Sequence, residues 1–230
     1  MNVREIKEKS RDALKSNWWI AMGALIIYGI VEPILTPPFP IIGNESVRFS
    51  ISLMLGVFIM APLYAGIEWL FLDIYDEKNV NLKQILDGFK LYGKVIGVSF
   101  LRGFFIFLWS FLLIVPGIIK SIAYSQTLYI LRENPNLSIN EAIKESERMM
   151  DGYKGSYFMI NLQLCLWLFA LIFPSGIAIT TLFMGVGIVY SLILLVIALI
   201  ASIVFFLYLI PLYSIILAGF YRELKNENNI

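Results

Sequence analysis

Three polar side chains that lie inside long apolar segments are the first candidates for chemistry: Glu68, Arg102 and Asn161. A charge inside a membrane is costly, so each one is expected to have a partner or a function. Glu68 and Arg102 lie about six and about seven residues from the inner ends of their predicted helices, which at ~1.5 Å per residue puts both roughly 10 Å deep. Equal depth in neighbouring helices would allow a charge-assisted pair, with Asn161 at a similar level.

This predicted cluster has three interpretations. Glu68 and Arg102 could form a fixed pair that sets the register of two helices. Alternatively, the cluster could line a polar cavity that opens to the cytoplasm and binds a small solute, an ion or a lipid head group. In the third interpretation, both side chains simply extend to the membrane surface.

Other kinds of chemistry are disfavoured by what the chain lacks. Histidine, the usual general base and the commonest metal ligand, is absent. No clustered nucleophile and no metal or phosphate motif stands out, so we expect no catalytic residue, no metal site and no cofactor. Asp73, Asp76 and Glu77 form an acidic cluster, but their spacing matches no metal loop and favours a solvated helix end. The single cysteine, Cys165, lies in an apolar stretch and is predicted to be buried.

The elements that must position these residues are membrane-spanning helices. From Gly155 to Tyr221 the chain has no Asp, Glu, Lys or Arg, and such a run covers about two or three crossings of a hydrocarbon core ~30 Å thick. The chain is 59% hydrophobic with a mean hydropathy of +0.77, against about 45–50% apolar in soluble domains. We predict an all-α fold, a polytopic transmembrane helical bundle that occupies residues 18–221 as one domain, followed by a polar tail at 222–230.

About six spans fit this pattern, since each needs about 20 apolar residues. Pro116 and Gly117 predict a tight hairpin turn between the third and fourth spans. Lys and Arg gather in the segments on one side, with Arg48 and Lys120 expected on the other, which predicts that both termini are cytoplasmic. About seven spans would result if the last apolar run crossed three times. The predicted spans are 18–35, 50–74, 95–115, 117–133, 156–174 and a last one inside 184–220.

The first 17 residues predict a short amphipathic helix at the membrane surface, with Lys and Arg around most of its circumference. It ends at the Trp18–Trp19 pair, a residue type enriched at membrane interfaces. A cleaved signal peptide is the competing interpretation, but no small-residue cleavage site follows, which favours retention. The residues expected on the apolar face are Val3, Ile6, Ser10, Ala13 and Leu14.

A second amphipathic helix is predicted at 138–151, on the cytoplasmic side. Ser138 and Glu141 have the Ser-x-x-Glu spacing of a capping box, which satisfies free N–H groups at a helix start. An apolar stripe follows, and it could pack against the ends of the bundle or the lipid surface, or serve as a docking surface for a partner. The stripe comprises Ile139, Ala142, Ile143, Met149 and Met150.

Two blocks of sequence resemble a known family. One is Val115-Pro116-Gly117-Ile118-Ile119-Lys120-Ser121-Ile122-Ala123-Tyr124-Ser125, and the other runs from Asn134 through Glu141-Ala142-Ile143-Lys144-Glu145-Ser146 to Gly152. With Pro211-Leu212-Tyr213 and Ala218-Gly219-Phe220-Tyr221, these blocks resemble an uncharacterised bacterial membrane family, domain of unknown function 975. More loosely, they resemble the membrane domain of some glycerophosphodiester phosphodiesterases, whose catalytic part is a separate domain that this chain lacks. The resemblance implies a multi-pass cell-membrane protein and brings no ligand residues.

Three classes of function remain. We favour an accessory or interaction protein of the cell membrane, whose cytoplasmic helix and basic links engage a protein partner, a second copy of the chain or anionic lipid at the inner face. The alternative is a small transporter or channel subunit that uses the polar cluster around Glu68 and Arg102. A lipid-acting enzyme ranks last, and a net charge of +1 gives no reason to expect nucleic acid.

Overall fold

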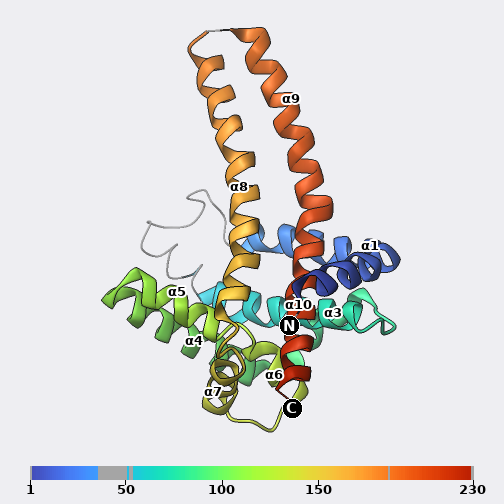
Figure 1. The fold of residues 1–230 in the computed structure, drawn as a ribbon, viewed down its shortest axis with the longest axis vertical. Coiled ribbons are helices and arrows are strands. Elements are labelled where there is room, and N and C mark those ends of the chain that lie inside the picture. The colour runs from blue at the N-terminus through green and yellow to red at the C-terminus, as the bar shows by residue number, and fades with distance from the viewer. Residues whose placement is uncertain (1, 36–50, 52–53, 186, 229–230) are drawn as a thin grey trace.

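The computed structural model describes residues 2–35, 51, 54–185 and 187–228, and these form helices and turns with no strand. The predicted all-α fold is therefore confirmed (Figure 1). The elements in chain order are α1 (Val3–Leu35), the π-helical turn η1 (Gly56–Met60), α3 (Ala61–Tyr75), the 3₁₀ helix η2 (Leu82–Leu91), α4 (Tyr92–Leu112), α5 (Ile114–Ala123), α6 (Thr127–Glu133), α7 (Ile139–Met149), α8 (Lys154–Phe183), α9 (Ile188–Val204), the π-helical turn η3 (Phe205–Leu209) and α10 (Ile210–Glu227).

Within the described residues, six helical stretches are long and apolar enough to cross a membrane. The last apolar run forms two helices rather than three, because α8 turns back once and α9, η3 and α10 follow one another without a break. This arrangement agrees with six spans and not with seven. The predicted tail at 222–230 begins inside α10, which continues to Glu227. The six stretches are Val3–Leu35, Gly56–Tyr75, Leu82–Leu112, Ile114–Glu133, Lys154–Phe183 and Ile188–Glu227.

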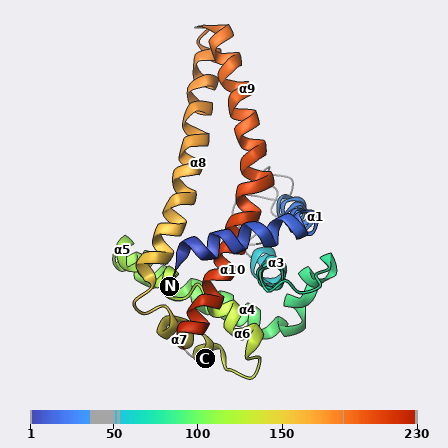
Figure 2. The ribbon, with the colours of Figure 1, turned by 45° about the vertical axis from the view of Figure 1, so that its right-hand side comes forward.

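Helices α8 and α9 form a hairpin that projects beyond the other helices (Figures 1 and 2). Gly185 and Gly187 allow the turn at its tip, since both have positive φ angles that favour glycine. Only 6% of the apolar stretch of α8 is buried inside the protein. Cys165, predicted to be buried, is exposed on this helix. The prediction was wrong because an apolar stretch in a membrane protein can face lipid as readily as a core.

The N-terminal amphipathic helix is the first half of α1, which bends at Asn17 (φ −123°, ψ 19°). This bend coincides with the predicted boundary at residue 17. Ile6, Ala13 and Leu14 on its apolar face are buried, as is Ser10. The face packs across α10 (Figure 2), where Gly219 leaves room for Ile6 and Tyr75. The apolar face is therefore covered by the chain's own helix.

The α4–α5 hairpin exists, but its turn lies at Leu113, whose extended backbone (φ −158°, ψ 142°) separates the two helices. Pro116 is in the first turn of α5, where its missing N–H costs little. Gly117 lies against Ser110 of α4, so that a Cβ there would overlap it. The prediction of a turn at Pro116-Gly117 was therefore wrong by about one helical turn, since both residues serve the start and the packing of α5.

Helix α7 has the predicted capping box. The Ser138 N–H donates to Glu141 Oε2 at 2.8 Å, and the Glu141 N–H donates to Ser138 Oγ at 3.3 Å. The predicted stripe faces inward, where Ala142, Met149 and Met150 join the main core. Ile143 is buried and Ile139 packs beside it against α4 and α5. The structure thus favours the interpretation in which the stripe packs against the bundle.

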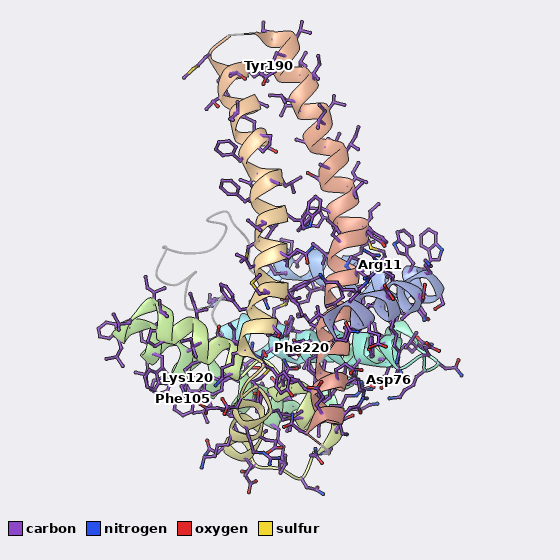
Figure 3. The ribbon with its side chains drawn as sticks, viewed as in Figure 1. Arg11, Asp76, Phe105, Lys120, Tyr190 and Phe220 are labelled. Atoms are coloured by element: carbon purple, nitrogen blue, oxygen red, sulfur yellow. The ribbon has the colours of Figure 1, made fainter. Side chains whose placement is uncertain are left out.

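The opposite edge of α7 forms an ion pair with α5, between Glu147 and Lys120. Lys120 also lies over the Trp109 ring, 5.3 Å from its centre, on the part of the α4–α5 hairpin near Phe105 (Figure 3). The prediction that Lys120 lies on the opposite side from the 138–151 helix was therefore wrong. The sequence pattern gave no sign of this pair, because the two residues lie 27 positions apart in the chain.

Helix α7 also supplies hydrogen bonds to the backbone where the helix is interrupted between α5 and α6. The chain turns at 124–126, which leaves backbone groups without helical partners. The fully buried Ser146 hydroxyl donates to the Ala123 carbonyl at 2.8 Å and accepts from the Gln126 N–H at 3.1 Å. One side chain of α7 thus satisfies both edges of the break.

The 3₁₀ helix η2 packs directly against α3. A Cβ on Gly88 would overlap the Pro62 carbonyl, and a Cβ on Gly66 would overlap the Ile85 carbonyl. Such backbone contact is a common role of glycine between helices in membranes. The two glycines therefore fix the distance between η2 and α3.

We expect Gly88→Ala to destabilise the protein by about 1–3 kcal/mol, since the added methyl group meets backbone that cannot move aside. Gly93→Ala is the matched control, because a Cβ there meets nothing within 4 Å. Reversible unfolding in mixed micelles measures both. Equal stability of the two variants would contradict this account of the η2–α3 contact.

We expect Ser146→Ala to cost about 1–3 kcal/mol, because it leaves the Ala123 carbonyl and the Gln126 N–H buried without a partner. Ser121→Ala is the control, since the Ser121 hydroxyl bonds only to Ile118 of its own helix. The same unfolding measurement compares them. A Ser146→Ala variant as stable as Ser121→Ala would show that the break does not depend on α7.

Candidate functional site

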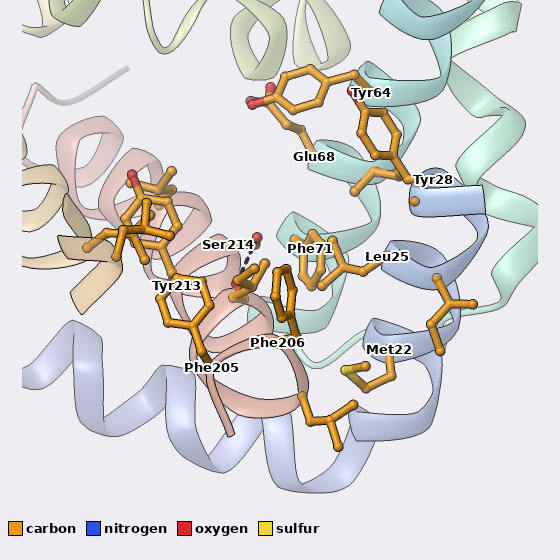
Figure 4. A pocket seen from close by; sticks show the side chains of 18 of the residues that line it. Met22, Leu25, Tyr28, Tyr64, Glu68, Phe71, Phe205, Phe206, Tyr213 and Ser214 are labelled. Carbon is orange, nitrogen blue, oxygen red and sulfur yellow. Dashed lines mark hydrogen bonds between the residues drawn. The ribbon is translucent and has the colours of Figure 1, made fainter. Parts of the chain in front are cut away.

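The largest cavity described lies among α1, α3, α8, η3 and α10 and has a volume of about 710 Å³. A volume of this size is ordinary for a small-molecule site, for which about 300–1,000 Å³ is typical. Its lining is nearly all aliphatic and aromatic, with Glu68 as the one charged side chain. Figure 4 shows Glu68 and Tyr64 together at one end of the cavity, and Met22 at the other. The cavity thus has a polar end and an apolar end.

The irregular segment η3 forms one wall, through Phe205 and Phe206. Pro211 follows it and has no N–H to donate to the carbonyl of Leu207, four residues earlier. The Trp18 indole Nε1 donates to that carbonyl instead, at 2.9 Å. A side chain from the bend of α1 therefore stabilises the π-helical wall, a kind of irregularity that is frequent at functional sites.

Glu68 is the central polar group of the cavity. Its Oε2 atom is covered and has no hydrogen-bond partner within the described part of the chain. The hydroxyl of Tyr64 is adjacent to the same carboxyl group, and the two polar ends face one another in Figure 4. A carboxyl oxygen buried without a partner costs free energy, so its retention needs an explanation.

Arg102 lines a second, smaller cavity of about 380 Å³ between α3 and α4. Tyr28 and Tyr64 line both cavities and stand between the two charges. Arg102 acts electrostatically on Glu68, but the ion pairs of the described residues do not include one between them. Their predicted pair is therefore a longer-range attraction rather than a direct contact.

The hydrogen bonds of Asn161 involve neither Glu68 nor Arg102. Its Nδ2 donates to the Tyr157 carbonyl at 2.8 Å within α8, and its Oδ1 accepts from the Tyr213 hydroxyl at 2.6 Å. Tyr213 lines the large cavity. Asn161 thus supports the wall of the site and does not join a cluster with Glu68 and Arg102.

A network of ion pairs closes the bundle below the cavity, at the ends of α3, α6 and α10. Arg132 binds Asp73, whose side chain is only 4% exposed. Arg222 binds both Asp76, with Nε 2.8 Å from Oδ1, and Glu133. Two further cations complete it, since Lys78 contacts Asp73 and Asp76 and Lys225 contacts Glu133. The acidic cluster predicted as a solvated end is therefore largely paired.

Burial alone raises the pKa of Asp76, but hydrogen bonds from Arg222 and Lys78 outweigh it and hold that pKa below its ordinary value. The Asp76 carboxylate is therefore stabilised in its charged form by the network. The described residues contain no group of three or more His, Cys, Asp or Glu side chains that could hold a metal ion.

Tyrosines within the apolar segments are a feature of the sequence that indicates the cavity. Four tyrosines, one from each of four apolar segments, point at one region of the structure. Tyr28, Tyr64, Tyr129 and Tyr213 all line the large cavity. A tyrosine inside an apolar span carries a hydroxyl that needs a polar neighbour, so several such residues indicate a shared polar centre.

Comparison with known proteins gives one match. A family model described as a protein of unknown function (DUF975) matches residues 1–122 and 111–228, which together cover almost the whole chain. No curated protein and no solved structure matches the chain.

We expect the stabilising effect of Asp76 to depend on pH. Because its folded-state pKa is lowered, its contribution is complete above the ordinary value of about 3.9 and disappears as the pH falls through the folded-state value. Wild type should be more stable than Asp76→Asn at pH 6, and the gap in Tm should narrow below about pH 4. Asp12→Asn, which removes the exposed pair with Lys15, should keep the wild-type profile. A constant gap between wild type and Asp76→Asn would contradict the pairing.

Proposed function

Because the chain belongs to the DUF975 family of proteins of unknown function, we propose its function from its structure: it binds an amphiphilic small molecule in the cavity beside Glu68. The observation that carries the proposal is a cavity of about 710 Å³ with an apolar lining and one covered carboxyl oxygen that has no hydrogen-bond partner among the described residues. Ligand sites are commonly of this kind, with few polar groups that fix orientation in an apolar cleft.

The walls of the cavity fit a ligand that arrives from the lipid. Ile26 of α1 and Phe206 of η3 line it, and each is more than half exposed. Hydrocarbon from the bilayer can therefore reach the cavity between helices. The sequence analysis gives a small transporter or channel subunit, acting through Glu68 and Arg102, as an alternative function. Such a protein must first bind its ligand in this way.

We place the protein in the cell membrane, with both termini on the cytoplasmic side. Six apolar stretches support insertion. The two termini both lie away from the tip of the α8–α9 hairpin (Figure 2). The excess of Lys and Arg in the segments near them supports the orientation.

An accessory role remains the second candidate. The apolar stripe of α7 is buried by the chain itself, so a partner or a second copy would use another surface. The α8–α9 hairpin is the largest such surface, since about nine-tenths of its apolar stretches are not buried inside the protein. Cross-linking through the natural Cys165, exposed on α8, tests for a neighbour there.

We expect Gly29→Leu to abolish binding in the cavity. Gly29 lines it, and a Cβ at this position meets nothing within 4 Å, so a leucine side chain can enter without a clash. Binding of the neutral fluorescent probe N-phenyl-1-naphthylamine to purified protein should weaken at least tenfold. Gly176→Leu, on the outside of α8 and equally free of neighbours, should bind like wild type. Equal binding by all three proteins would refute the proposed function.

A further inference from the structure

The polar end of the large cavity has the chemistry of a cation site. Glu68 is its single charged residue, and no Lys or Arg is among the residues that line it in the described part of the chain. The cavity therefore presents one acidic group and no basic one. An anionic ligand would oppose ionisation of that group, whereas a cation would supply the counter-charge that a buried carboxylate needs.

Aromatic rings surround the same end. Tyr64 reaches the carboxyl group, Tyr28 lies beyond Tyr64 on the same side, and Tyr213 and Phe205 line the other side of the cavity (Figure 4). The faces of aromatic rings attract cations, and such sites commonly bind ammonium groups whose substituents contact the rings. The carboxylate supplies charge, while the rings supply apolar contact.

Arg102 does not occupy the position beside the Glu68 carboxyl group. Arg102 lines the separate cavity beyond Tyr28 and Tyr64, and it forms no ion pair with Glu68 in the described residues. The Oε2 atom of Glu68 has no hydrogen-bond partner there either. The attraction from Arg102 offsets part of the negative charge, and among the described ion pairs no cation contacts the Glu68 carboxyl group.

We propose that the ligand is a hydrophobic organic cation, whose positive group lies against Glu68 and whose apolar body fills the cavity toward Met22. The proposal rests on the proposed function, because it requires that the cavity binds a ligand at all. It adds the charge of that ligand, and with it the role of Glu68 as the residue that selects for charge.

Two ions of the same shape and opposite charge test the proposal. Tetraphenylphosphonium and tetraphenylborate are each titrated into purified full-length protein that holds N-phenyl-1-naphthylamine. We expect the phosphonium concentration that displaces half of the probe to be at least ten times lower for wild type than for Glu68→Gln. The corresponding borate concentration should be no lower for wild type than for the variant. Comparing each ion with itself removes differences in how the two ions partition into detergent.

Glu8→Gln is the matched control, since Glu8 pairs with Arg4 on the exposed face of α1 and lies outside the cavity. It should retain the wild-type preference. If Glu68→Gln does not fold, Glu68→Leu, which also removes the acidic group, takes its place, and each ion is again compared with itself in the two proteins.

The possible failures are distinguishable. If the probe binds and is blocked by Gly29→Leu, but the phosphonium displaces it no better from wild type than from Glu68→Gln, the cation proposal is overturned and the proposed function stands. If neither the probe nor either ion binds in a way that Gly29→Leu reduces, the proposed function fails together with the cation proposal.

Discussion

The ion pairs at the ends of α3, α6 and α10 are the constraint on which the rest of the structure depends. Arg222 holds Asp76 and Glu133 at once, and these three residues come from segments that are distant in the sequence. Ion pairs removed from water return little net free energy, because desolvation offsets most of the attraction. Their better-attested effect is on register, since a shift of one helix would leave buried charges unpaired. Both α3 and α10 also line the cavity, so the network that joins these helices constrains the spacing of two of its walls.

Two irregularities in the helices are each matched by a side chain from elsewhere in the chain. Pro211 has no N–H for the Leu207 carbonyl, and the Trp18 indole donates a hydrogen bond to it instead. At the break between α5 and α6, the Ser146 hydroxyl forms hydrogen bonds with the backbone on both sides. Trp69 likewise donates to the Leu128 carbonyl at 2.9 Å. In a membrane no water can replace a missing backbone partner, so irregular segments persist only where protein groups satisfy them. The walls of the cavity include one such segment, which gives it a shape that regular helices would not provide.

The features that the sequence predicts well are local ones. The capping box of α7, the buried face at the start of α1 and the six apolar stretches depend on residues within a few turns of one another. The partners of charged residues could not be predicted in this way, because Arg222 and Asp76 are 146 positions apart. Equal depth predicted that Glu68 and Arg102 pair directly, but depth says nothing of Tyr28 and Tyr64, which line the cavities of both residues. The cavity was predicted only as one interpretation of a polar cluster, since its apolar walls resemble any packed core.

The α8–α9 hairpin sets a length that the surrounding bilayer must match. Helix α8 has 30 residues, or roughly 45 Å at ~1.5 Å per residue, whereas a typical hydrocarbon core is ~30 Å thick. Its residues from Gly155 onward carry no charge that could mark an earlier exit from the lipid. Such hydrophobic mismatch is relieved by tilting the helices or by thickening the membrane around them, at a modest cost per ångström. The hairpin therefore makes the energy of the protein depend on membrane thickness, and thicker regions of membrane will accumulate it.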